Sequence, residues 1–310
     1  MDDVNLALAE ETARAVLNLV TPGSELISIT TAQGSFSNYT HILTSRLQNG
    51  SLYRIVVRRY KLFGNYDRGE KARREFKTFE LLNRYGIPAP AALYLDETGE
   101  VLEIPGIITR FVEGSLLLDA PSDPVVWARK LAGTLANIHA IPCGAEEQEF
   151  LLKGNPEASW FLNSDGPPGY MQAYPGGSEL WQILRNRFPN IEPDLPVLLH
   201  LDYWSGNILW YEDEISAVID WEEAAYGDPA VDAGYAAMNM VLMGLPEAAD
   251  EFIKAYEAQT GRELRNLGFW ELAAAVRPMI DPEVWKIHKP PGSNRFQNFI
   301  EGAKKGHELR

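Results

Sequence analysis

Residues 200–221 read HLDYWSGNILWYEDEISAVIDW, and their pattern is the most informative in the chain. An apolar run from Ile208 to Trp210 leads to an acidic turn at Glu212–Asp213, and a second apolar run covers Ile215–Ile219. Two short apolar runs separated by a turn predict a β-hairpin, whose two ends lie side by side. The residue before the first strand and the residue after the second are therefore predicted to be neighbours.

These two residues are Asn207 and Asp220, and Asp202 lies upstream in the same loop. Oxygen ligands beside a carboxylate suit a hard cation such as Mg²⁺ and a general base. Asp and Asn also punctuate ordinary turns, so each residue alone is explained as well by a turn as by catalysis. The three together, in the order H-x-D-x₄-N, hairpin, Asp, have the layout of the base and metal ligands of protein kinases.

The stretch resembles the catalytic core of the aminoglycoside phosphotransferase family, which includes antibiotic, choline, fructosamine and homoserine kinases. That family typically has H-G-D-x₄-N, then I-D-W/F-E, then G-D-P-x-x-D. The matching residues are His200-Leu201-Asp202, Asn207, Ile219-Asp220-Trp221-Glu222, Gly227-Asp228-Pro229 and Asp232. Two positions depart from the pattern, because Leu201 stands where Gly is usual and Ser205 where Pro is common. Neither departure removes a ligand or the base, but both are expected to reshape the loop.

The resemblance implies a protein-kinase-like two-lobed fold and phosphoryl transfer from ATP or GTP to a hydroxyl of a small molecule. Asp202 would activate the acceptor hydroxyl, while Asn207 and Asp220 would hold the Mg²⁺ that bridges the nucleotide phosphates. His200, Asp228 and Asp232 would support the loop, with Asp232 as its anchor. From the residues alone, Asp232 is only an acid in the first turn of a helix, where the helix dipole favours it.

The resemblance also implies nucleotide contacts in the first third of the chain. They are Gly34, Ser35, Phe36 and Ser37 over the phosphates, Arg58 as the phosphate clamp, Glu75 as its ion-pair partner, and the backbone of Arg110 and Val112 against the adenine. By composition, Arg59, Arg73 and Arg74 are equally eligible as the clamp. The loop has a single Gly, so it also fits a plain hairpin turn.

The pattern of the whole chain predicts an α+β architecture. Strands are predicted at residues 26–31, 39–45, 51–60, 92–95 and 106–112, and helices at 69–84, 124–140, 246–260 and 263–280. Asp228–Pro229 is typical of a helix start, with Asp as the N-cap and Pro at the first helical position. The C-terminus is expected to be loosely structured. We predict a nucleotide-binding lobe at residues 1–114 and a catalytic, acceptor-binding lobe at 115–310.

The charge of the chain predicts what it binds. The formal net charge is −15, which argues against a nucleic-acid surface because such surfaces cluster Lys and Arg. Residues 1–114 are nearly balanced, whereas residues 115–310 carry 15 bases and 29 acids, and no base lies between Arg187 and Lys254. A cleft with one sign of charge attracts the opposite ion. We therefore predict a cationic acceptor of aminoglycoside, macrolide or amino-alcohol type, with Glu222 and Glu223 as candidate contacts.

Other function classes are disfavoured. Cys143 is the single cysteine, so an intrachain disulfide and a zinc finger are excluded. The start has no basic region leading into an apolar one, and no apolar stretch is long enough to cross a bilayer, which predicts a cytoplasmic protein without membrane contact. Nothing in the pattern indicates an oligomeric state. The alternatives left open are a pseudokinase that binds nucleotide without turnover, a homoserine- or fructosamine-type metabolic kinase, and a metallohydrolase built on His200 and Asp202.

Overall fold

The computed structural model describes residues 7–32, 38–62, 67–192, 194–287 and 293–308. The chain divides into two compact units. Unit 1 comprises Met1–Ser115 and Leu209–Glu223, and unit 2 comprises Leu116–Ile208 and Ala224–Arg310. Unit 1 is rich in strands and unit 2 is mainly helical, which confirms the predicted α+β class.

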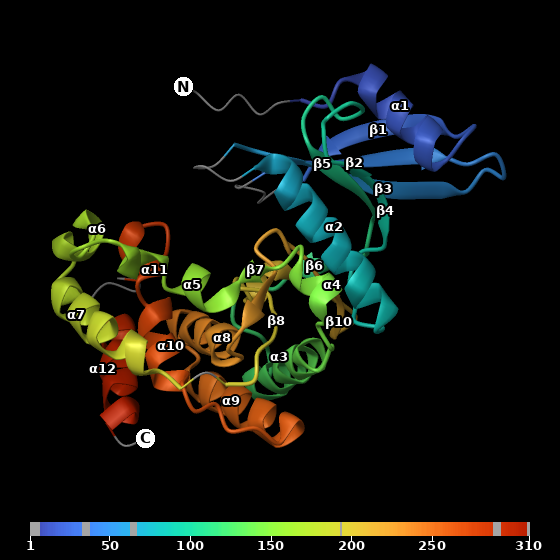
Figure 1. The fold of residues 1–310 in the computed structure, drawn as a ribbon. Coiled ribbons are helices and arrows are strands. Elements are labelled where there is room, and N and C mark those ends of the chain that lie inside the picture. Colours follow the sequence, from blue (N-terminus) through green and yellow to red (C-terminus); the bar gives the residue numbers. More distant parts are fainter. Residues whose placement is uncertain (1–6, 33–37, 63–66, 193, 288–292, 309–310) are drawn as a thin grey trace. The chain divides into compact units, whose positions relative to one another are not determined.

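Unit 1 is built on an antiparallel sheet with the strand order β1-β2-β3-β5-β4 (Figure 1). The strands are β1 (Glu25–Thr31), β2 (Asn38–Arg46), β3 (Leu52–Tyr60), β4 (Ala92–Asp96) and β5 (Gly106–Arg110). In this sheet Arg58 pairs with Thr40 on one side and with Ile107 on the other. Arg58 is thus held in the central strand, which fixes the direction of its side chain.

Two helices cover opposite faces of this sheet: α1 (Glu10–Val20) and α2 (Arg68–Arg84). Ile55 and Val57 of β3 pack in a core with Val16 and Leu17 of α1. Side chains alternate along a strand, so Arg58 points to the other face, where its Nε lies 3.1 Å from a carboxylate oxygen of Glu75 on α2. The alternation places Arg58, and not Arg59, on the face of the sheet that contacts Glu75. Composition alone could not distinguish the two arginines.

A hairpin follows later in the chain, formed by β9 (Ile208–Tyr211) and β10 (Glu214–Val218), with β6 (Ser115–Leu116) beside β9. The turn residues Glu212 and Asp213 have φ angles of 49° and 64°. Positive φ at both central residues is the geometry of a type I′ hairpin turn. The predicted hairpin is therefore present. Asn207 belongs to unit 2 and Asp220 to unit 1, so their proximity stays a prediction.

Unit 2 consists mainly of helices joined by short connections. They are α3 (Pro124–His139), α4 (Ala145–Gln148), α5 (Gly154–Ala158), α6 (Gly169–Ala173), α7 (Gly177–Arg187), α8 (Ala230–Leu242), α9 (Pro246–Thr260), α10 (Leu267–Ala274), α11 (Arg277–Ile280) and α12 (Arg295–Glu308), with 3₁₀ turns η1 (Trp160–Asn163), η2 (Phe188–Asn190) and η3 (Ser205–Asn207). A small sheet has the order β7-β11-β8, with β7 (Leu152–Lys153), β8 (Val197–Leu199) and β11 (Ala225–Gly227). Helix α8 is buried from Ala230 to Met240. Among the described residues, no helix is long and apolar enough to cross a membrane.

The structure differs from the predicted elements in three places. Helix α1 was not predicted at all. The single helix expected at residues 263–280 is split into α10 and α11, and Pro278 at the start of α11 explains the break, because proline lacks an N–H and restricts the residue before it. The C-terminus is not loosely structured, since α12 buries Phe296, Ile300 and Ala303 along one face.

His41 is expected to make the free energy of unfolding depend on pH. It is buried on β2, and neither ring nitrogen has a hydrogen-bond partner among the described residues. Burial, helped by the nearby Arg59, lowers the pKa of His41. The unfolded chain therefore binds the proton more tightly, so stability is complete above the unfolded pKa of about 6.5 and falls as the pH drops below it. The expected slope from this residue is at most about 1.4 kcal/mol per pH unit.

The measurement is denaturant unfolding of the wild type and His41→Leu between pH 7.5 and 5. The variant should lose less stability over this range than the wild type. Equal slopes for both proteins would show that His41 has the same pKa in the folded and the unfolded state.

Candidate active site

The loop after β8 is held by one buried carboxylate of α8. Asp232 has no exposed surface. Its Oδ2 accepts from the backbone N–H of His200 at 2.7 Å and its Oδ1 from that of Leu201 at 2.8 Å. Nε2 of His139 lies 3.3 Å from Oδ2, while Nδ1 of the same ring contacts the Tyr256 hydroxyl at 2.7 Å. Asp232 thus fixes the backbone immediately before Asp202 and joins it to α3.

Leu201 explains why its position usually belongs to glycine. Its φ angle is 64°, a left-handed conformation that costs a residue with a Cβ about 1–2 kcal/mol. Glycine adopts it freely. Here the side chain of Leu201 is buried, and this burial offsets the backbone strain. The backbone at Leu201 therefore has a conformation that glycine adopts without strain.

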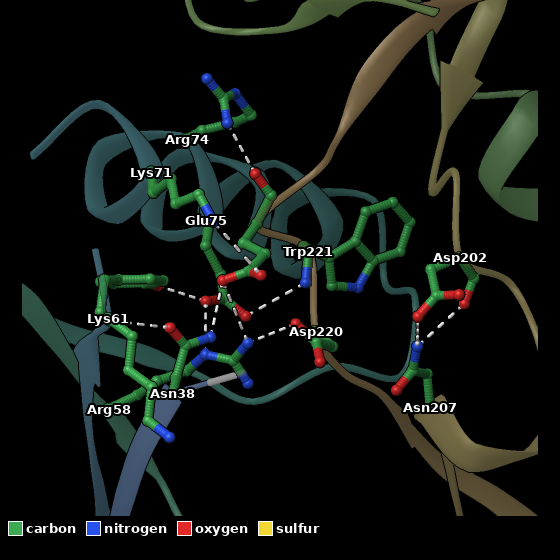
Figure 2. A network of polar contacts seen from close by, with 12 residues as sticks. Asn38, Arg58, Lys61, Lys71, Arg74, Glu75, Asp202, Asn207, Asp220 and Trp221 are labelled. Atoms are coloured by element: carbon green, nitrogen blue, oxygen red, sulfur yellow. Dashed lines mark hydrogen bonds and ion pairs between the residues drawn. The ribbon is translucent and has the colours of Figure 1, made fainter. Parts of the chain in front are cut away.

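Asp202 has a partner on each of its carboxylate oxygens. Nδ2 of Asn207 donates to Oδ2 at 2.7 Å and to the backbone oxygen of Asp202 at 2.9 Å (Figure 2). The hydroxyl of Tyr235 donates to Oδ1, and Nη1 of Arg277 lies 3.7 Å from the same oxygen. An amide nitrogen has two hydrogens, so both are used on Asp202. The carbonyl oxygen of Asn207 is the atom left to bind a cation.

Unit 1 holds a second cluster, centred on Arg58. Figure 2 shows the guanidinium between the carboxylates of Glu75 and Asp220; the Arg58–Glu75 pair is 3.1 Å apart and the Arg58–Asp220 pair is a close ion pair. Oε2 of Glu222 lies 3.5 Å from Nη2 of Arg58. Burial alone would lower the pKa of Arg58, but Asp220, Glu75 and Glu222 together raise it well above its usual value. The guanidinium is therefore a fixed positive charge beside Asp220.

Glu75 is the most enclosed member of this cluster. It is almost fully buried, accepts from the Tyr60 hydroxyl, and accepts from the backbone N–H of Trp221 at 3.1 Å. Burial raises the pKa of the Glu75 carboxyl, and Arg58 opposes that shift. Because Glu75 binds both Arg58 and the residue after Asp220, it couples α2 to the end of the hairpin.

Asp220 itself has a φ angle of 69°. A non-glycine residue in this region is strained by about 1–3 kcal/mol and needs its surroundings to hold it. The ion pair with Arg58 and the bond from the N–H of Trp221 to Glu75 supply that support. About a quarter of the Asp220 side chain stays exposed, so solvent reaches the carboxylate.

Glu222, predicted as an acceptor contact, is surrounded by polar partners in unit 1. Its side chain is largely buried in unit 1, where Oε2 accepts from Nδ2 of Asn38 at 2.6 Å and Oε1 lies 3.6 Å from Nζ of Lys71. Its backbone oxygen accepts from Arg74 at 2.6 Å. The acid therefore has several partners inside unit 1, and a contact of Glu222 with the acceptor stays a prediction. Lys71 and Arg74 stand one helical turn apart on α2, a spacing that could have predicted a shared acidic partner.

The remaining predicted residues are placed as follows. Gly34, Ser35, Phe36 and Ser37 lie outside the described residues. Arg110 is exposed at the end of β5, and its N–H donates to the Ala91 oxygen at 2.8 Å. Val112 and Glu223 are half-buried.

Asp228 is buried and fixes the start of α8. Its carboxylate accepts from the N–H of Ala230 at 2.9 Å and from the amide of Asn266. Tyr235 and Arg277, which sequence reasoning missed, contact Asp202.

The predicted metal ligands are divided between the two units, with Asp220 in unit 1 and Asn207 in unit 2. Among the described residues, no group of three or more His, Cys, Asp or Glu side chains could hold a metal ion. Mg²⁺ usually takes one or two carboxylates together with substrate phosphates and water. The Asp220 carboxylate and the Asn207 amide oxygen are donors of the kinds that such a cation takes, and a shared ion stays a prediction.

Comparisons with solved structures show the fold. Choline kinase from Streptococcus pneumoniae superposes with a TM-score of 0.61 at 18% identity, covering 97% of this chain and 99% of that chain. A macrolide 2′-phosphotransferase type I gives 0.61 at 19% identity and 97% of both chains. Spectinomycin phosphotransferase in complex with ADP and spectinomycin gives 0.61 at 14% identity, covering 95% and 98%. The protein-kinase-like fold is therefore confirmed.

Sequence comparisons add the family. Acyl-CoA dehydrogenase family member 10 from Mus musculus is 24% identical over 183 residues, which span 54% of this chain and 17% of that longer protein. The chain thus spans less than a fifth of that relative's length. The model of the phosphotransferase enzyme family matches residues 28–268. This match covers most of the chain and includes Arg58, Asp202 and Asp220, so the chain belongs to the phosphotransferase enzyme family.

Proposed function

We propose that this phosphotransferase moves the γ-phosphoryl group of ATP to a hydroxyl of a small molecule, with Asp202 as the base. The observation that carries the proposal is the pairing of Asp202 with Asn207. The amide hydrogens orient the base, and the amide oxygen is left for a cation. ADP is named in the solved spectinomycin phosphotransferase complex and ATP in a streptomycin phosphotransferase complex, which favours ATP over GTP here.

The chemistry follows from these roles. The acceptor hydroxyl donates its proton to the Asp202 carboxylate while its oxygen forms a bond to the γ-phosphorus. The bond from that phosphorus to the bridging oxygen breaks, and ADP leaves. Asp220 and Asn207 would hold Mg²⁺, whose charge stabilises the nucleotide phosphates, and Arg58 adds a fixed positive charge beside Asp220. The proposal includes phosphate contacts from Gly34–Ser37, adenine contacts from the backbone of Arg110 and Val112, and a cytoplasmic location.

Two observations bear on the charge of the acceptor. The excess of acids in residues 115–310 favours a cationic acceptor, and Glu223 remains a candidate contact for it. The position of Arg277 beside Asp202 favours an acceptor with an anionic group instead. Glu222, the other candidate contact for a cationic acceptor, already has partners inside unit 1. We give the local contact more weight.

A pseudokinase is the second candidate, and turnover separates the two. A pseudokinase would bind nucleotide with the same residues but release no ADP in the presence of any acceptor. The proposed base and both proposed metal ligands are present, which favours the enzyme.

The experiment that tests the nucleotide site is thermal unfolding with ATP, with and without Mg²⁺. Ligand at 100 times its Kd adds about 2.7 kcal/mol of stability, which for a chain of this size raises Tm by several degrees. We expect Asp220→Asn to remove most of the Mg²⁺-dependent part of this shift. The matched control is Asp213→Asn in the turn of the same hairpin, which should keep it. A full Mg²⁺-dependent shift in Asp220→Asn would refute the assignment of Asp220 as a metal ligand.

A further inference from the structure

The two oxygens of the Asp202 carboxylate face different surroundings. Oδ2 accepts from Asn207, whose carbonyl oxygen is the proposed metal ligand. Oδ1 accepts from the Tyr235 hydroxyl and lies 3.7 Å from the Arg277 guanidinium. If the metal and phosphates lie on the Asn207 side of the base, the acceptor approaches from the side of Tyr235 and Arg277.

Arg277 is held in this position by its packing. It is the first residue of α11, and its guanidinium lies over the ring of Tyr235, 4.9 Å from the centroid. The ring of Tyr235 is itself fixed against Trp285, with centroids 6.2 Å apart. The cavity beside Leu201, Tyr235 and Arg277 measures about 20 Å³, little more than one water molecule needs. The guanidinium therefore lies against the Tyr235 ring, with little empty space on the side of this cavity.

The side chain of Arg277 is nevertheless reached by solvent, because 25% of it is exposed, as is 31% of the Asp202 side chain. A ligand can replace that solvent. A guanidinium offers five donors in a planar fork that matches carboxylate and phosphate oxygens. Its charge also opposes that of Asp202, so an anion can approach the base without meeting an uncompensated negative charge. A cation at the same place would meet Arg277 and be repelled.

We infer that Arg277 is a specificity-determining residue that binds an anionic group of the acceptor, a carboxylate or a phosphate monoester, near the hydroxyl that is phosphorylated. This inference rests on the proposed function. It replaces the cationic acceptor that the net charge predicts, for a physical reason. Exposed acids such as Glu212 and Glu214 act through solvent and are screened beyond about 10 Å, whereas Arg277 acts at contact distance on the bound acceptor.

The test is a coupled ADP-release assay on matched primary alcohols. At each of several chain lengths the far end carries a carboxylate, a phosphate monoester, a neutral carboxamide or an ammonium group. The wild type should prefer an anionic member over the carboxamide of equal length by about 10- to 100-fold in kcat/KM, the range of a hydrogen bond to a charged group. Most of this preference should lie in KM. The carboxylate and phosphate arms show which anion is preferred.

Variants of Arg277 assign the preference to this residue. In Arg277→Met the ratio of anionic to carboxamide kcat/KM should fall close to one, and Arg277→Lys should keep part of it. The ratio is the readout, because any disturbance of Asp202 lowers both of its members alike. The matched control is Arg129→Met, which removes an exposed pair with Glu251 and should keep the wild-type ratio and rates.

The inference is overturned if the carboxamide or ammonium member is preferred, if Arg277→Met keeps the wild-type ratio, or if no member of the series is phosphorylated. Slow hydrolysis of Mg²⁺–ATP that Asp202→Asn abolishes would show that the proposed function stands although the inference has failed. Loss of both this hydrolysis and the Mg²⁺-dependent thermal shift would overturn the proposed function as well.

Discussion

Asp202→Asn should lower kcat by about 10²- to 10⁴-fold, the contribution of a positioned general base. The substitution keeps the size of the side chain and removes its ability to take a proton. The Asn207 amide, which now donates to Oδ2, can still donate to the oxygen of the new amide. The Tyr235 hydroxyl, which now donates to Oδ1, can turn to accept from the new NH₂ group, because a hydroxyl both donates and accepts. The loop should therefore keep its path, and the loss should fall on the chemical step. Steady-state kinetics with the best acceptor measures it.

Nucleotide binding separates this role from a structural one. The Mg²⁺–ATP thermal shift of Asp202→Asn should stay close to that of the wild type, and Asp213→Asn should have normal kcat. If Asp202→Asn weakened nucleotide binding by the same factor as kcat, Asp202 would instead be a metal ligand or a structural residue. A fall in kcat of less than about tenfold would mean that positioning by other groups carries nearly all of the catalysis, as phosphoryl transfer in principle allows.

The sequence was sufficient for the hairpin and the strands of unit 1 because their signals are local. Apolar runs flank the turn at Glu212–Asp213, and the observed strands begin and end within one residue of the bounds expected from them. The strands of the first sheet are also predictable, since the alternation of buried and less buried side chains along β3 involves consecutive residues only. Helix α12 was missed even though its buried residues are spaced at helical intervals, because charged and glycine residues surround them.

The contacts of Asp202 could not be predicted because they join distant parts of the chain. Tyr235 stands in an apolar helix and looks like a core aromatic, and Arg277 follows a run of alanines with no polar pattern around it. Only the tertiary fold of unit 2 brings both side chains to Oδ1 of one carboxylate. The partners of Glu222 could not be predicted for a related reason, since counting acids does not show that one of them is paired inside unit 1 with Lys71.

The anchoring of the catalytic loop leads to the largest expected effect on stability. Asp232→Ala would leave two buried backbone N–H groups, those of His200 and Leu201, without their acceptor, and would remove a partner of His139. Each unsatisfied buried donor costs about 1–3 kcal/mol, so the free energy of unfolding should fall by about 3–5 kcal/mol. Denaturant titration measures it, provided that the transition is two-state for unit 2.

Two further variants decide whether this loss comes from the hydrogen bonds. Asp232→Asn keeps one acceptor oxygen and presents an NH₂ group to the other backbone N–H, so its loss should be intermediate. Asp250→Ala, at an exposed position on α9, should change stability by no more than about 0.5 kcal/mol. Because the two N–H groups belong to the residues directly before Asp202, Asp232→Asn should also lower kcat more than it lowers the Mg²⁺–ATP thermal shift. If Asp232→Ala were as stable as Asp250→Ala, solvent or another group would have to satisfy His200 and Leu201, and Asp232 would not be the anchor of the loop.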